Sequence, residues 1–178
     1  MWSRRFSLST SNIPVKQFMY RKVLYCPEKK IAEFNYKMFT NILICGYTVN
    51  KWNKQISSIC EQCQVNHTIE HLIYECNKVK HIWQLVGDTL KVDLSWYKIM
   101  FGFLYEGKQY EDLCHTISLI AFCIYKTWVL NNNDIHKHVI QVIRHEMNTR
   151  VKMLKDENYK YVRLKWNRNL IERLLNVL

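Results

Sequence analysis

Glycine and proline are scarce in this chain of 178 residues, which contains four glycines and two prolines. Folds rich in β-strands need these residues for the tight turns between strands. Their scarcity therefore argues against an all-β fold. Apolar residues make up 48% of the chain and charged residues 23%, as is usual for a globular protein. We expect a mainly α fold in one compact module.

The sequence also lacks the marks of a secreted or membrane protein. Its seven cysteines are an odd number, and Arg4, Arg5 and Lys16 precede no continuous apolar stretch of the kind found in signal peptides. The most apolar stretch, residues 113–130, includes Lys126, which favours a buried helix over a membrane span. We expect an intracellular protein, nuclear or cytoplasmic, whose partners include neither a membrane nor a small-molecule substrate.

Acidic residues are missing from the first 27 positions, and the formal net charge of +11 is concentrated in two segments. Residues 1–30 carry seven Lys/Arg against one acid and residues 134–169 carry nine against four, while the remaining residues balance ten bases with ten acids. Clustered bases attract polyanions, because each neutralised phosphate releases condensed counterions. The distribution favours nucleic acid as a partner. Either run alone would also fit a solvated face, and the first resembles a mitochondrial transit peptide as well as a binding arm.

Apolar residues recur at spacings of three and four along most of the chain, as they do on the buried face of a helix. The helices that this spacing predicts cover residues 31–45, 79–86, 113–128, 135–154 and 162–174. Gly46 is expected to end the first helix, Asn77 to cap the second and Asp134 to cap the fourth. Residues 47–58 fit either a short helix or a loop, and residues 91–103 are predicted to pack irregularly.

A group of potential metal ligands has the spacing C-x2-C-x7-H-x4-C and consists of Cys60, Cys63, His71 and Cys76. Three thiolates and one imidazole complete a tetrahedral shell that suits zinc, and four protein ligands leave no open position for catalysis. Residues 68–71 are expected to start a helical turn that presents the imidazole. We therefore predict one structural Zn²⁺ ion, whose binding is worth roughly 10 kcal/mol in zinc-finger peptides.

His67 is a competing ligand, because it follows the second cysteine at the spacing C-x3-H. We favour His71, since it leaves the more usual gap of four residues before Cys76. The motif has a longer central gap than the C-x2-C-x4-H-x4-C of a retroviral zinc knuckle, and it contains no glycine. The other four cysteines lie in apolar stretches and fit buried small side chains. They are Cys26, Cys45, Cys114 and Cys123.

Several segments form a pattern together with the cysteine pair. They are FNYKMFTNIL at residues 34–43, Trp52, TIEHLIYEC at residues 68–76, Ile82-Trp83 and, less specifically, IMFG at residues 99–102, residues 119–126, 157–159 and Trp166. Together they resemble the zinc-binding C-terminal region of LINE-type (non-LTR) retrotransposon reverse transcriptases. The resemblance spans roughly residues 24–170.

The resemblance implies an accessory module that binds template RNA or target DNA during target-primed reverse transcription. Basic side chains of the C-terminal segment would contact phosphates without reading sequence. The candidate contacts are Arg144, Arg150, Lys152, Arg163, Lys165 and Arg168. The polymerase domain of the parent protein is a further candidate partner. The chain itself contains no adjacent pair of aspartates of the kind that binds the metal ions of a polymerase, so we expect no enzymatic activity from it.

We accordingly divide the chain into a basic N-terminal arm at residues 1–30, a helical zinc-binding core at 31–130 and basic C-terminal helices at 131–178. Exposed tryptophan or tyrosine could stack on unpaired bases, although Trp83, Trp128 and Trp166 fit the apolar faces of helices.

Three alternatives stay open. The chain could be a protein-docking domain whose zinc site shapes a surface, or a non-functional remnant of the retrotransposon polyprotein. A nuclease needs acidic residues around a divalent cation with a nearby lysine, and Asp88, Asp93 and Lys98 are the one loose match after the motif.

Overall fold

The computed structural model describes residues 22–23, 26, 28–103, 111–130, 135–155 and 167–178, and at residues 135–137 and 155 it describes the backbone alone. The elements are α2 Lys29–Phe39, α3 Gly46–Val49, the π-helix η2 His71–Glu75, α4 Asn77–Leu90, α5 Trp96–Phe101, α6 Glu111–Leu130, α7 Ile135–Lys155 and α9 Arg168–Leu175. The described residues form no named strand, and Ile59 pairs with Asn66 in an isolated antiparallel bridge. The mainly α fold is confirmed.

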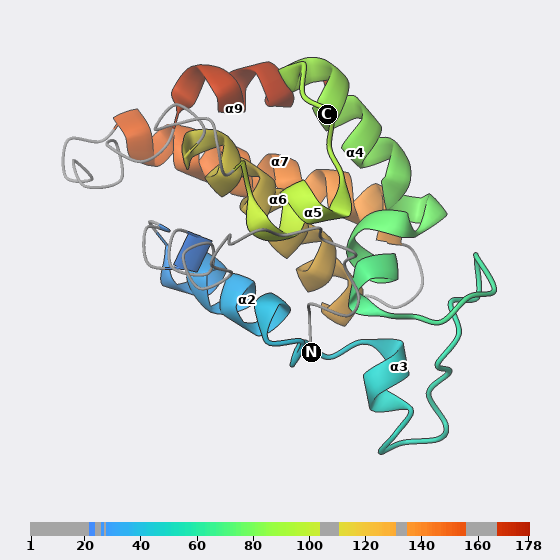
Figure 1. Cartoon of the computed structure of the whole chain (residues 1–178). Helices are drawn as coiled ribbons and strands as arrows, with labels where there is room; N and C mark the ends of the chain where they lie inside the picture. The colour runs from blue at the N-terminus through green and yellow to red at the C-terminus, as the bar shows by residue number, and fades with distance from the viewer. Residues whose placement is uncertain (1–21, 24–25, 27, 104–110, 131–134, 156–166) are drawn as a thin grey trace, which may run out of the picture.

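The core is built around α6, which packs against α2, α5, α7 and η2. Figure 1 shows α6 and α7 running together through the middle of the molecule. By length and composition α6 is the one described helix that could cross a membrane, but 61% of its apolar window is buried inside the protein. The buried residues of α6 are not confined to one face, as expected for a helix that neighbouring helices cover from several directions.

The long helix predicted at residues 135–154 is confirmed as α7. Its inner face buries Val139, Ile143 and Met147 at the spacing of a helix packed along one side. The last helix, α9, packs against both α7 and α4, and Asn167 caps it by accepting a hydrogen bond from the backbone of Leu170. Residues 162–166 of the predicted terminal helix and Asp134 lie outside the described residues.

The predicted helix at residues 31–45 is too long. α2 ends at Phe39, and Asn41 then adopts the left-handed conformation, with a φ of 56°, that commonly terminates a helix. Gly46 begins α3 instead of ending a helix. The reason for a glycine here is crowding, because a Cβ atom on residue 46 would lie 2.7 Å from Nδ1 of His67.

Two expectations about residues 77–103 are also wrong. The segment predicted to pack irregularly includes α5, which is capped by the hydroxyl of Ser95 accepting from the Lys98 backbone at 3.3 Å. Asn77 is the first residue of α4 and does not cap it, since Cys76 occupies the capping position.

Candidate metal centre

The four predicted ligands lie together at the junction between the loop region after α3 and the helical body. Cys60 and Cys63 lie on a turn, His71 begins η2 and Cys76 directly precedes α4. One ligand atom from each of the four lies within 4.8 Å of all the others. Within the described part of the chain, no other group of three or more His, Cys, Asp or Glu side chains is arranged to hold a metal ion. These four residues could hold one.

The distances between sulfur atoms fit a shared ion. Sγ of Cys76 lies 3.9 Å from Sγ of Cys60 and 3.9 Å from Sγ of Cys63. Two sulfurs bound to one tetrahedral zinc at about 2.3 Å would be separated by about 3.8 Å. A disulfide would need about 2.05 Å. The arrangement is therefore that of a ligand cage and not of a crosslink.

A wide helical turn brings His71 and Cys76 to the same point. In η2 the backbone amide of Cys76 donates to the carbonyl of His71 at 2.8 Å, a bond between residues five apart. In an α-helix five residues span about 1.4 turns, so their side chains would point in different directions. The H-x4-C spacing is thus the spacing of one π turn. The predicted turn at residues 68–71 is present, and the Thr68 hydroxyl accepts from the His71 backbone at 3.1 Å.

The amino end of α4 is directed at two of the sulfurs. The backbone amide of Asn77 donates to Sγ of Cys63 at 3.5 Å, and the amide of Lys78 donates to Cys76. The first amides of a helix have no partner within the helix and carry partial positive charge. They therefore stabilise the thiolate form of cysteine, which is the form that binds a metal ion.

Burial acts in the other direction on the two most enclosed ligands. It raises the pKa of the Cys76 thiol to about 12, despite the hydrogen bond from Lys78, and it lowers the pKa of His71, which Glu75 partly offsets. Both ring nitrogens of His71 are buried without a hydrogen-bond partner. Buried polar atoms normally have one. A cation would supply that partner and would favour deprotonated thiols beside a neutral imidazole.

His67, the competing ligand, lies beside the quartet and has a different role. Its Nδ1 accepts a hydrogen bond from the Gly46 backbone at 3.1 Å, and its ring centroid lies 5.1 Å from that of Trp128 and 6.1 Å from that of His71. Burial, followed by His71 and Lys78, lowers the pKa of His67 to about 4. The imidazole is therefore neutral at neutral pH, as acceptance of a hydrogen bond at Nδ1 requires.

The predicted phosphate contacts differ in how accessible they are. Arg144 and Lys152 are exposed on α7 and form no ion pair with another described residue. Arg168 is exposed, but its Nε lies 2.7 Å from the carboxylate of Glu172. Arg150 is only 4% exposed and its guanidinium is held by two carboxylates, so no phosphate can reach it and its prediction is not retained. Arg163 and Lys165 lie outside the described residues.

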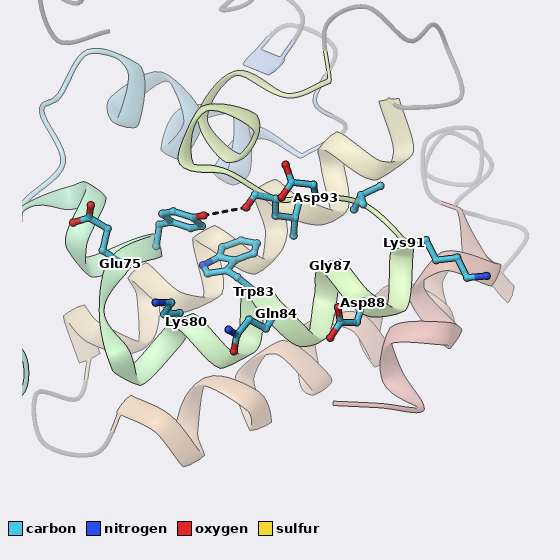
Figure 2. Close-up of a pocket in the computed structure, with 11 residues that line it drawn as sticks. Glu75, Lys80, Trp83, Gln84, Gly87, Asp88, Lys91 and Asp93 are labelled. Carbon is cyan, nitrogen blue, oxygen red and sulfur yellow. Dashed lines mark hydrogen bonds between the residues drawn. The ribbon is translucent and has the colours of Figure 1, made fainter. Parts of the chain in front are cut away.

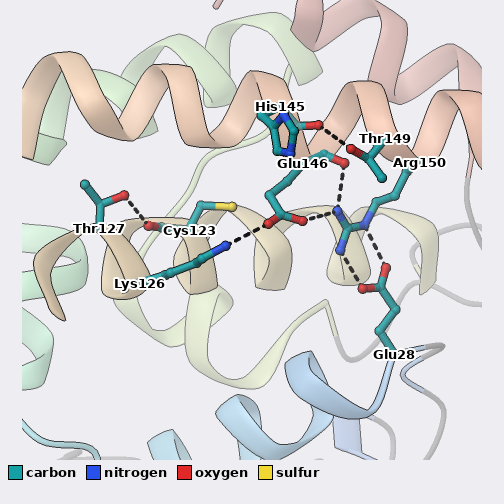
Figure 3. A network of polar contacts seen from close by, with 8 residues as sticks. All are labelled: Glu28, Cys123, Lys126, Thr127, His145, Glu146, Thr149 and Arg150. Carbon is teal, nitrogen blue, oxygen red and sulfur yellow. Dashed lines mark hydrogen bonds and ion pairs between the residues drawn. The ribbon is translucent and has the colours of Figure 1, made fainter. Parts of the chain in front are cut away.

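The exposed side chains of α7 include no carboxylate, a feature that the sequence prediction missed. Between residues 138 and 152 the exposed set, here called the α7 face, consists of His138, Gln141, Arg144, His145, Asn148 and Lys152. Glu146, the single acid of this helix, points inward to Lys126 and Arg150 (Figure 3). The apolar spacing of α7 could have revealed this, because it places position 146 next to the buried Met147 and Ile143.

A cavity of about 840 Å³ runs along α4, between that helix and the segment at residues 91–94. Figure 2 shows that Asp88 and Asp93, the acids of the nuclease alternative, line it. Asp93 pairs with Lys98 at 3.3 Å, and neither aspartate belongs to a potential ligand group in the described part of the chain. The cavity therefore adds nothing in favour of a nuclease.

No family model, no curated protein and no solved structure matches this chain. The features of this chain that bear on its function are therefore the ligand quartet, the surface of α7 and the motifs of the sequence.

Proposed function

We propose that this chain is a zinc-stabilised module that binds RNA or DNA through phosphate contacts, as an accessory region of a non-LTR retrotransposon reverse transcriptase. The observation that carries the proposal is the α7 face, an exposed helical stripe with basic and amide side chains and no carboxylate. The motifs at residues 34–43 and 60–83 supply the assignment to this class of element.

The α7 face suits a phosphate backbone for electrostatic and geometric reasons. Arg144 can donate two parallel hydrogen bonds to one phosphate, and Lys152 adds a positive charge two turns further along the same helix. Gln141 and Asn148, on the same stripe, can donate hydrogen bonds without adding charge. Because Glu146 is turned inward, no carboxylate on this stripe repels the ligand.

Zinc is the ion that the donor set favours. Thiolates are soft ligands, and three of them with one imidazole are typical of structural zinc sites. The shell is complete, so the ion would join the cysteine turn to η2 and would leave no position for a substrate. We expect its role to be the stabilisation of this junction.

The metal is tested by elemental analysis of purified, reduced protein, which should contain one zinc ion per chain. Cys76→Ser should lower both the zinc content and the melting temperature, because it removes a ligand from a closed shell. Cys26→Ser is the matched control, since this thiol does not belong to the quartet and bonds the Glu28 carbonyl at 3.5 Å, as a serine also can. Reduced protein without zinc would refute this part of the proposal.

Nucleic-acid binding is tested by measuring affinity for duplex DNA and for RNA over a series of salt concentrations. The double variant Arg144→Gln/Lys152→Gln should bind more weakly and should reduce the slope of log K against log salt by up to about two for a duplex. Lys37→Gln/Lys98→Gln is the control, because both lysines are already paired with acids. Affinity that does not depend on salt, or equal slopes for both double variants, would count against the proposal.

Docking onto a partner protein is a second candidate function. Among the residues that the structure describes, eight of the eleven exposed large hydrophobic side chains lie between residues 36 and 65, although this segment is less than a fifth of the chain. Such clustering marks many interaction surfaces. This alternative predicts that neutralising Arg144 and Lys152 leaves a complex with the polymerase region intact.

A further inference from the structure

Residues 46–59 form a loop that stands out from the helical body and begins with α3 (Figure 1). One residue, His67, closes both ends of the loop. It accepts from the Gly46 and Tyr47 backbones, each at 3.1 Å, and its own backbone donates to the Ser58 carbonyl at 2.8 Å. The base of the loop is therefore fixed directly beside the metal ligands.

Hydrogen bonds also fix the tip of this loop. The Asn50 side chain donates to the carbonyl of Ile56 at 2.7 Å, and the Asn53 side chain accepts from the Gln55 backbone at 3.0 Å. The backbone of Trp52 donates to Val49 at 2.9 Å. The conformation that directs the Trp52 side chain outward is thus held by several bonds.

Trp52 is the most exposed large hydrophobic side chain of the described residues, at 75%. Trp83 and Trp96 are only 3% and 6% exposed, and Trp128 packs against His67. An indole has one of the largest apolar surfaces among side chains and usually buries most of it. The exposed indole of Trp52 lies on a loop whose conformation is fixed by hydrogen bonds. It therefore offers a flat apolar surface on which a planar group of a ligand could stack.

The charge around Trp52 indicates the class of that ligand. Residues 46–60 contain Lys51 and Lys54 and no acid. The Lys51 ammonium lies 4.9 Å from the centroid of the exposed Tyr47 ring. Lys51 and Asn53, which flank Trp52 in the chain, are basic and polar, whereas the centre of a protein interface is usually apolar and poor in lysine. Aromatic side chains next to lysines are the typical surface for single-stranded nucleic acid.

We infer that Trp52 is a stacking platform for an unpaired base of single-stranded RNA or DNA, with Lys51 and Lys54 contacting the adjacent phosphates. The inference rests on the proposed function and adds to it a second contact site, on a different element from the α7 face. The duplex part of a ligand would meet basic side chains on α7, and an unpaired segment would meet the loop.

The test uses the full chain loaded with zinc and three labelled probes of one sequence: single-stranded RNA, single-stranded DNA and duplex DNA. Trp52→Ala should weaken binding to both single strands about tenfold and leave duplex affinity unchanged, because only unpaired bases offer a free face. Trp52→Phe keeps an aromatic face and should retain most of the affinity. Ile56→Ala is the matched control, since it removes an exposed apolar side chain from the same loop.

The variants are first shown to be folded by equal melting temperatures, as the exposure of Trp52 leads us to expect. Equal single-strand affinities of Trp52→Ala and the unchanged chain would overturn the platform, while a loss of binding in Arg144→Gln/Lys152→Gln would still support the proposed function. No binding of the unchanged chain to any probe would overturn both. If Trp52→Ala altered only the oligomeric state in light scattering, the indole would be a protein-docking residue and the platform would be wrong.

Discussion

The guanidinium of Arg150 lies against the carboxylate of Glu28, 122 positions earlier in the chain, with Nε 2.7 Å from Oε1 and Nη2 2.5 Å from Oε2. Nη1 lies 2.9 Å from the carboxylate of Glu146, which also accepts from Lys126 at 3.0 Å (Figure 3). The network ties the start of α2 to α6 and α7. Arg150 is at its centre, so this arginine stabilises the fold.

Replacing Arg150 by methionine should lower the free energy of unfolding by about 3 kcal/mol, because it leaves two acids without their shared counter-charge. Glu28 keeps partial solvent access, which places the effect at the lower end of the range for buried pairs. Urea unfolding measures the change. The exposed Lys152→Met, two positions further along, should stay within about 0.5 kcal/mol of the unchanged chain. Similar losses in both variants would contradict the assigned role.

The same network predicts a loss of stability in acid. Burial alone would raise the pKa of Glu146, but hydrogen bonds and charges from Arg150 and Lys126 outweigh it, so the pKa lies below its ordinary value of 4.5. A carboxyl with a lowered pKa stabilises the folded state above the unfolded pKa, and this stabilisation is lost as pH falls through the folded pKa. Unfolding measured from about pH 6 to about pH 3 should show a shallower decline in Glu146→Gln. Parallel curves for the two proteins would refute the prediction.

Trp83 supports the metal turn from the core. Its indole Nε1 donates to the carbonyl of Ile73 within η2 at 2.6 Å, and the indole is buried. Trp83→Phe should cost about 1 to 3 kcal/mol, because it leaves a buried carbonyl without its partner. It should also weaken zinc binding in competition with a chelator. Trp96→Phe makes the same change of ring at a buried position outside the turn, and it should leave zinc affinity unchanged.

Gly46→Ala should disturb the base of the 46–59 loop. The added methyl group would lie 2.7 Å from Nδ1 of His67 and 2.9 Å from the carbonyl of Ser57, so one of these must move. We expect a loss of about 1 to 3 kcal/mol in thermal or urea unfolding. Gly87→Ala is the comparison, since its closest contact is 3.0 Å and alanine is better suited than glycine to the interior of α4. An effect at Gly87 as large as at Gly46 would be inconsistent with the crowding at His67.

The helices of the core could be predicted because one local property determines them. In α6 and α7 the apolar residues recur every three or four positions, and burial of that stripe outweighs other preferences. The ligand quartet was predictable because the ligands of structural zinc sites commonly occur at short, characteristic spacings in the sequence. The choice of His71 over His67 followed from the gap before Cys76, which the structure shows to be one π turn.

The features that the sequence did not predict depend on contacts between residues far apart in the chain. An exposed arginine and a buried, paired one look alike in sequence, and the partner of Arg150 is 122 positions away. In the sequence, Gly46 resembled the end of a helix. The structure shows instead that glycine is needed there because His67 lies too close for a larger side chain. Trp52 occupies a polar segment with no periodic pattern, so only the folded loop reveals that its indole is open.

His67 holds both ends of the 46–59 loop together. A change in the length of the loop should therefore leave the metal centre intact. The entropy of closing a loop changes only slowly with the number of residues in it. Exposed loops whose ends lie together are also where proteins best tolerate insertions. A foreign peptide inserted between Trp52 and Lys54 should therefore leave the ligands and the core folded. A chain with a different segment at this position could therefore recognise a different ligand while it keeps the same helical core and metal centre.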